Sequence, residues 1–259
     1  MTRIQDARKA YLEKDINKLK ASHLKNVVDK DAEHKEKHLV GFNLPEIILG
    51  GQDGLVNVLG VILGVAAATA SSKVVIVAGL AATFAESVSM AAVAYTSKLA
   101  EADYYQSEME REKWEIENAP EGEVEEIRVL YRDYGFEGEI LEDIVKKITS
   151  DKDIWLKIMM EQELKLQRVD RKQALPSGFL VGISALIGSF IPLTAYFFLP
   201  ITYATIFSLI LAAGVLFAAG YYKAKVTLGR NFMKEAIKML LIGMLSAFVG
   251  YLVGIIFKV

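Results

Sequence analysis

The sequence predicts an all-α, polytopic membrane protein with five transmembrane helices and a helical cytoplasmic insert between the second and the third. Two observations support this fold class. The 259 residues are 53% hydrophobic but also 24% charged, so the two kinds of residue must occupy different segments. Five apolar stretches reach the roughly 20 residues that a spanning helix needs. They lie at about 47 to 70, 74 to 99, 177 to 198, 201 to 222 and 236 to 257.

The distribution of charge divides the chain into four parts. Residues 1–45 form a charged leader with a weakly amphipathic helical pattern, and residues 46–100 contain the first two spans. Residues 101–175 are strongly acidic, and we expect them to form a compact cytoplasmic metal-binding domain of three or four helices. Residues 176–259 contain the last three spans.

Helix-breaking residues place the helices of the insert. The second span is expected to continue as a polar helix to Asn118, because Ala119-Pro120 interrupts the pattern there. A second helix then runs to about Tyr134. Two more are predicted at about 137 to 149 and 151 to 170.

Lysine and arginine residues predict the topology. They are dense in the leader, in the insert and in the connection between the fourth and fifth spans, but sparse in the other connections. The positive-inside rule therefore places the N-terminus and the insert in the cytoplasm and the C-terminus on the exterior or lumenal side. The membrane would be the plasma membrane in a prokaryote and the vacuolar membrane in a eukaryote.

Several function classes are disfavoured by residues that the chain lacks. Without cysteine there is no disulfide and no thiolate metal site. The sequence contains no phosphate-binding loop motif, which disfavours ATP-driven pumping by this chain. The three histidines, His23, His34 and His38, all lie in the leader, so the Glu-x-x-His pairs of di-iron carboxylate enzymes are missing. We therefore expect no enzyme, no prosthetic group and no nucleic-acid partner.

Four residues of the first two spans could form an ion pathway. Asp53 lies in the first span with Asn57 one turn later on the same face, and Glu86 and Met90 share one face of the second span. A carboxylate at membrane depth costs about 2.5 to 3.5 kcal/mol on insertion scales, so such a group generally marks a path for ions or protons. An interfacial Asp53 that caps the helix, and a Met90 that only packs, are the structural alternatives.

A second group of candidate ligands lies in the insert. Acidic side chains recur there at helical spacing, which stacks like charges on one face unless a cation joins them. Thioethers and a further carboxylate follow within one turn of the last helix, although buried methionines commonly serve packing alone. The candidates are Glu108, Glu112, Glu115, Glu123, Glu126, Met159, Met160 and Glu163. Oxygen and sulfur together suit a borderline transition metal better than Mg²⁺ or Ca²⁺.

Short motifs in one consistent order resemble those of the vacuolar iron transporter family, which includes yeast and plant vacuolar proteins. They run from about residue 46 to the end of the chain. The motifs are Asp53-Gly54-Leu55-Val56, Ser89-Met90, Glu101-Ala102-Asp103-Tyr104-Tyr105, Arg111-Glu112-x-x-Glu115 and Trp155-Leu156-x-x-Met159-Met160-x-x-Glu163.

This resemblance implies a function and an assembly. It implies a homodimer in membrane lipid, with the translocation path between the subunits, that exports Fe²⁺ from the cytoplasm in exchange for protons. Asp53 and Met90 would be its membrane metal residues. Its cytoplasmic metal residues would be Glu112, Glu115, Glu123, Glu126, Met159, Met160 and Glu163.

Two alternatives stay open at the level of sequence. The same architecture could export Mn²⁺, or carry Zn²⁺ or Co²⁺, because oxygen ligands accept these ions and methionine only tilts the choice. A membrane metal sensor or scaffold that transports nothing is the second alternative. The acidic residues Asp53 and Glu86 argue against a sensor, which would not need carboxylates inside the membrane.

Overall fold

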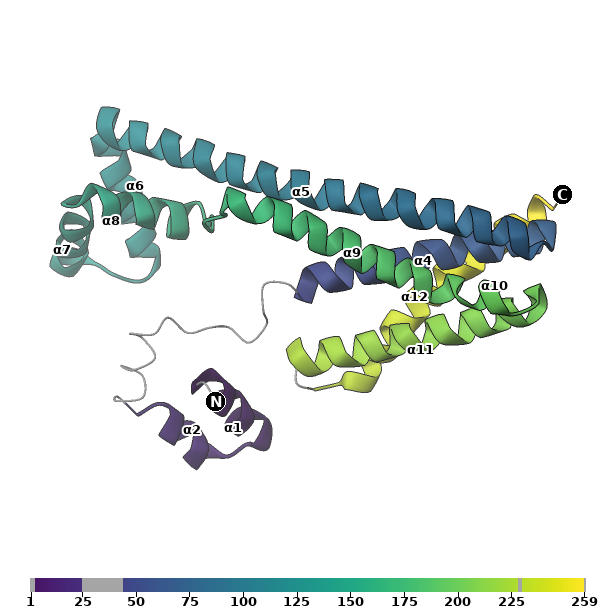
Figure 1. Ribbon diagram of the computed structural model, residues 1–259. Helices are drawn as coiled ribbons and strands as arrows, with labels where there is room; N and C mark the ends of the chain where they lie inside the picture. The colour runs from purple at the N-terminus through teal and green to yellow at the C-terminus, as the bar shows by residue number, and fades with distance from the viewer. Residues whose placement is uncertain (1–2, 25–43, 228–229, 259) are drawn as a thin grey trace. The chain divides into compact units, whose positions relative to one another are not determined.

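The computed structural model describes residues 3–24, 44–227 and 230–258, and every regular element within these ranges is a helix (Figure 1). The chain divides into two compact units. The bundle unit comprises Met1–Ala91 and Leu180–Val259, and the insert unit comprises Ala92–Phe179. Helix α5 (Ser72–Asn118) runs without a break from the first unit into the second.

The described part of the leader forms two short helices, α1 (Arg3–Glu13) and α2 (Ile16–Ser22). Asp15 caps α2, since its carboxylate accepts a hydrogen bond from the backbone N–H of Lys18 at 3.0 Å. The expected weakly amphipathic helix is thus present in two pieces. His34 and His38 lie outside the described residues.

Within the described ranges, five helices are long and apolar enough to cross a membrane, which confirms the predicted number of spans. The third differs from the prediction. Its helix ends at Leu193, next to Pro192, and the short helix α10 (Ala195–Phe198) follows, because proline disrupts the regular backbone of a helix. The apolar helices are α4 (Leu44–Thr69), α5, α9 (Ala174–Leu193), α11 (Ile201–Thr227) and α12 (Phe232–Ile256).

Glycines set how closely the helices of the bundle unit approach. A Cβ atom on Gly188 of α9 would lie 2.1 Å from the carbonyl oxygen of Gly51 on α4. A Cβ atom on Gly254 of α12 would lie 2.0 Å from the carbonyl oxygen of Gly64. Only glycine permits the two backbones to come this close. Close contact through small residues is a common way for helices to associate in lipid. Helix α4 is therefore held against both α9 and α12.

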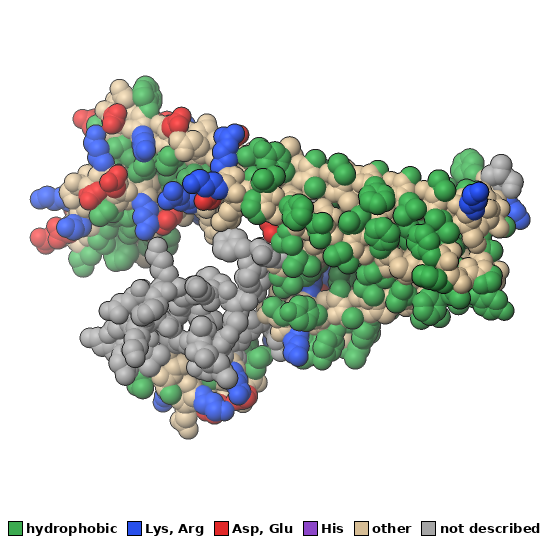
Figure 2. Space-filling view, in the orientation of Figure 1, with side chains coloured by type: hydrophobic (Ala, Val, Ile, Leu, Met, Phe, Trp, Pro, Cys, Tyr) green, Lys and Arg blue, Asp and Glu red, His purple; other side chains and the backbone are tan. Residues whose placement is uncertain are grey.

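The outer surface of the bundle unit is apolar, as expected of a surface that faces lipid. Figure 2 shows hydrophobic side chains over these helices, whereas Lys, Arg, Asp and Glu gather over the insert unit. Val88 of α5 and Leu245 of α12 are among the exposed apolar residues. In water such a surface would be unfavourable, so it supports a membrane location.

The insert unit is built from the polar end of α5 and the helices that follow it. These are α6 (Pro120–Asp133), α7 (Gly138–Thr149), α8 (Lys152–Ile158) and the π-helical turn η1 (Met159–Glu163). Ile127, Trp155 and Met159 lie in their common hydrophobic core. The prediction of a helix to residue 170 was wrong. The helix widens into the π-turn and ends at Glu163, and Lys165 then adopts a left-handed backbone with φ of 55°.

Candidate functional site

Three carboxylates from two helices meet in the insert unit. Glu112 and Glu115 lie near the end of α5, and Glu123 lies in the first turns of α6. Each offers one oxygen, and these atoms all lie within 4.8 Å of one another. The break at Ala119 and the proline at the start of α6 let the chain turn so that the two acidic faces meet. We call Glu112, Glu115 and Glu123 the carboxylate cluster.

Two members of the carboxylate cluster are buried without full hydrogen bonding. Glu112 is 1% exposed and Glu123 is 5% exposed. One carboxylate oxygen of each, Oε2, accepts no hydrogen bond from the described residues. A buried and unpaired charged oxygen is strongly destabilising, so this arrangement calls for a cation or a proton.

Burial and mutual repulsion raise the affinity of these groups for protons. Burial raises the pKa of Glu112 from 4.5 to about 7, and nearby carboxylates add to this effect. The pKa of Glu123 is raised to about 7 by burial, together with the charges of Glu126, Glu112 and Glu115. Burial likewise raises the pKa of Glu163, with Glu126 contributing. Protons and a divalent cation would thus compete for the same oxygens near neutral pH.

Arg111 contacts the carboxylate cluster, although it was not among the candidate site residues predicted from the sequence. Its guanidinium contacts Glu112 at 2.6 Å and Glu108 at 3.0 Å, and it also pairs with Glu115. The signal was available, because a base three residues after one acid and four before another lies between them on a helix. Arg111 thus supplies positive charge to the carboxylate cluster from its exposed side.

The remaining predicted ligands of the insert occupy different surroundings. Glu108 pairs with Arg111 and is not one of the three clustered carboxylates, whereas Glu126 and Glu163 are close enough to act on the cluster electrostatically. Met159 is fully buried in the hydrophobic core of the insert. Met160 is 2% exposed and lies in the same π-turn. Single π-turns occur frequently at functional sites.

A second polar group lies in the bundle unit. The side-chain amide of Asn57 on α4 donates a hydrogen bond of 2.6 Å to the Glu86 carboxylate on α5. The carboxyl group of Asp53 is close enough to that of Glu86 to interact with it directly. Met90 lies one turn after Glu86 and is partly buried. The structure therefore joins Asp53, Asn57 and Glu86 into one group, which we call the membrane carboxylate group.

This membrane carboxylate group lies on an open side of the bundle unit. Asn57 is exposed, and Asp53 and Glu86 are only partly buried. Val88 and Ser89 beside them on α5 are exposed as well. Polar groups that face lipid are costly. A single chain thus leaves these groups incompletely covered.

Comparison with known proteins fits this arrangement. The VIT family model matches residues 44–255, which hold all five apolar helices and the insert. The chain belongs to the VIT family. Vacuolar iron transporter 1 of Eucalyptus grandis is 35% identical over 217 residues, which are 83% of this chain and 87% of that protein.

Two further VIT-family relatives match different shares of the chain. Vacuolar iron transporter of Plasmodium falciparum is 32% identical over 265 residues, or 98% of this chain and 96% of that protein. Vacuolar iron transporter 1 of Arabidopsis thaliana is 34% identical and covers 83% of this chain and 86% of its own length. Because the match to the Plasmodium relative covers 98% of the chain, it includes most of the leader.

Proposed function

We propose that this VIT-family chain moves Fe²⁺ out of the cytoplasm across a membrane in exchange for protons. The membrane carboxylate group carries the proposal, because two acidic side chains and an amide meet on neighbouring spans. Groups of this kind inside a membrane protein generally bind ions or relay protons. The iron transporters among its relatives support Fe²⁺ as the cargo.

The insert unit would collect the metal. Carboxylate oxygens replace part of the water around a hydrated cation, and the two unbonded oxygens of Glu112 and Glu123 are suited to this. Arg111 must yield its contacts as the cation enters, because both are attracted by the same carboxylates. A metal that arrives in the cytoplasmic insert could then pass to the spans.

In the membrane, binding and release would be linked to protons. A deprotonated Asp53 or Glu86 binds Fe²⁺, and Met90 offers a thioether one turn from Glu86. Protons that arrive from the far side neutralise the carboxylates and weaken the metal site. Protonation of the same carboxylates would thus release the metal, so proton entry and metal departure are coupled. This coupling is the physical basis of an antiporter.

A homodimer would complete the pathway. Asn57 and Ser89 are exposed on the side of the bundle unit where the membrane carboxylate group lies. A second copy on this side would shield these groups from lipid and would place two sets of carboxylates around one path. The proposed orientation has the leader and the insert in the cytoplasm and the C-terminus outside or in the lumen.

Manganese is a second candidate cargo. The three clustered ligand atoms are all oxygens, and Met159 lies in the hydrophobic core. Carboxylate oxygens such as these accept Mn²⁺ as well as Fe²⁺. This observation favours a transporter that also handles Mn²⁺.

Transport in proteoliposomes tests the proposal. Purified protein is reconstituted, a pH gradient is imposed, and Fe²⁺ uptake is followed with Mn²⁺ as a competitor. Asp53→Asn keeps the size of the side chain and should abolish gradient-dependent flux, whereas Glu139→Gln, an exposed change in the insert unit, should leave it intact. Equal flux in Asp53→Asn would remove Asp53 from the mechanism. Metal binding with no flux in the wild type would favour a sensor.

A further inference from the structure

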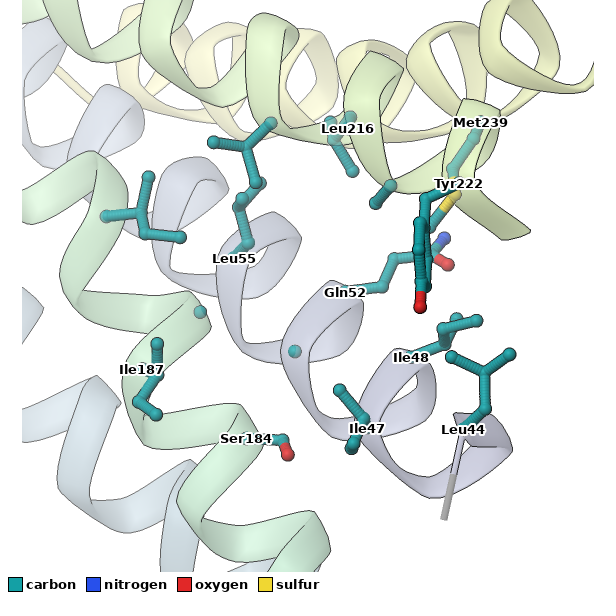
Figure 3. Close-up of a pocket in the computed structure, with 15 residues that line it drawn as sticks. Leu44, Ile47, Ile48, Gln52, Leu55, Ser184, Ile187, Leu216, Tyr222 and Met239 are labelled. Carbon is teal, nitrogen blue, oxygen red and sulfur yellow. The ribbon is translucent and has the colours of Figure 1, made fainter. Parts of the chain in front are cut away.

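A pocket of about 380 Å³ lies within the bundle unit between α4, α9, α11 and α12 (Figure 3). Its walls are almost entirely apolar and include Leu55, Ile187 and Leu216. Ile187 is 61% exposed, so the pocket opens on the outer surface of these helices. The proposed transport does not use this pocket.

The pocket has a polar end. Figure 3 shows Gln52 and Tyr222 near Leu44 and Met239, whereas Leu55 and Ile187 lie farther along the pocket. Leu44 begins α4 and Tyr222 lies five residues before the end of α11, so these two residues mark the end of the pocket nearest the membrane surface. Gln52 lies eight residues, or about 12 Å, farther along α4, and the apolar walls extend in the same direction into the membrane.

The length of the pocket matches one leaflet of a bilayer. Its lining on α4 runs from Leu44 to Leu55, which is about 16 Å at 1.5 Å per residue. Half of the hydrocarbon core of a bilayer is about 15 Å thick. An acyl chain that enters at the polar end would therefore fit along the apolar walls.

Basic residues lie next to two of the lining residues along the chain. Lys223 directly follows Tyr222, and Lys238 directly precedes Met239, so each base adjoins a residue that lines the pocket. The chain from Tyr221 to Lys238 holds five bases and one acid. Within the described part of the chain, Lys223 and Lys238 form no ion pair with an acidic side chain. Their charge is available to an anion at the membrane surface.

We infer that this pocket binds an anionic phospholipid, with an acyl chain along Leu55, Ile187 and Leu216 and the phosphate near Lys223 and Lys238. Tyr222 would lie at the level of the glycerol and ester groups, where amphipathic side chains are stable. Clusters of bases beside spans attract anionic lipids. An anionic phospholipid supplies both a negatively charged phosphate for the bases and an acyl chain for the apolar walls.

Such a lipid would contact the helix that carries the proposed ion pathway. Gln52 lines the pocket and directly precedes Asp53 on α4. Gly51 and Gly188, which hold α4 against α9, also line it. Bound lipid would therefore stabilise the packing of α4. The inference concerns binding alone and does not depend on which ion is carried.

Native mass spectrometry of the delipidated full chain tests this binding. Dioleoyl-phosphatidylglycerol and dioleoyl-phosphatidylcholine are titrated in parallel, and the retained lipid is counted. We expect tighter retention of phosphatidylglycerol. Lys223→Gln combined with Lys238→Gln should weaken it about 25-fold, because each base near a membrane surface contributes about 1 kcal/mol, or about fivefold. The matched pair Lys73→Gln with Lys258→Gln, at the opposite ends of spans, should change nothing.

A steric variant tests the acyl chain separately. Ile187→Trp fills the mouth of the pocket and should lower retention of phosphatidylglycerol, whereas Leu245→Trp alters an exposed apolar position outside the pocket and should not. Equal retention of the two lipids, or equal loss in both pairs of lysine variants, would overturn the inference. It would also be overturned if Ile187→Trp changed only the oligomeric mass, since a second copy would then cover the pocket.

Discussion

Replacing Glu112 with Gln should have opposite effects on the stability of the insert and on its affinity for metal. The side chain of Glu112 is buried, and its pKa is raised from 4.5 to about 7. The folded insert therefore binds a proton more tightly than the unfolded chain does. The contribution of Glu112 to the stability of the folded insert is therefore fully present below about pH 4.5 and is lost as the pH rises through about 7.

The size of the effect follows from this shift. A rise of about 2.5 in the pKa of Glu112 means that its ionised carboxylate destabilises the folded insert by at most about 3.4 kcal/mol at pH 8. The raised pKa already includes the attraction of the partly exposed Arg111, and solvent at the guanidinium screens part of the effect. Glu112→Gln should therefore raise the free energy of unfolding of the metal-free insert by about 2 kcal/mol at pH 8. At pH 4.5 the gain should vanish.

Tryptophan fluorescence provides the assay in the full chain. Both tryptophans, Trp114 and Trp155, lie in the insert unit, so thermal unfolding followed by their emission reports on the insert. For a unit of this size, about 2 kcal/mol raises Tm by about 10 °C. The same variant should bind divalent metal at least about 10-fold more weakly.

The exposed Glu110→Gln on the same helix is the control and should change neither property. A Glu112→Gln protein that is less stable than the wild type at pH 8 would refute the reasoning. It would mean that hydrogen bonds to the carboxylate outweigh its burial.

Three further predictions concern the insert and the bundle. Metal affinity of the insert should fall by about 10- to 100-fold from pH 8 to pH 6 in calorimetric titrations, because Glu112 and Glu123, each with a pKa of about 7, then bind protons. Arg111→Gln should strengthen metal binding several-fold at pH 8 by removing a competing cation. Gly188→Leu should separate α4 from α9 and lower the yield of monodisperse protein, since its Cβ would lie 2.1 Å from a carbonyl oxygen.

Each of these has a matched comparison. The pH effect should be largely lost when Glu112 and Glu123 are both Gln, and a persistent effect would place the titrating groups elsewhere. Arg132→Gln removes an exposed base in the same unit and should leave metal affinity unchanged. Weaker metal binding in Arg111→Gln would show that Arg111 organises the carboxylates instead of competing with metal. Gly214→Leu, where a side chain meets open space, controls for Gly188→Leu.

Much of the fold could be predicted because the bilayer fixes the length and the composition of the spans. A spanning helix needs about 20 apolar residues, and the chain offers five such stretches. The end of α5 at Asn118 followed from Ala119-Pro120, a local signal. The end of the insert's last helix at Glu163 did not, because the π-turn and the left-handed Lys165 carry no clear local pattern.

The candidate sites were predicted in part for a similar reason. Helical spacing places Glu112 beside Glu115 within one helix. It does not show that Glu123 approaches from α6, or that Asn57 donates a hydrogen bond to Glu86, because both depend on packing between helices. The burial of Met159 in the core and the lipid pocket likewise required the tertiary structure.

The proposed transport depends on the exchange of metal for protons at the membrane carboxylates. The most direct test records the pH inside sealed proteoliposomes while Fe²⁺ is added outside and its uptake is measured in the same sample. We expect iron entry to be accompanied by proton exit in a fixed ratio, and we expect both to cease in Asp53→Asn. Iron entry with no change in internal pH would contradict this expectation.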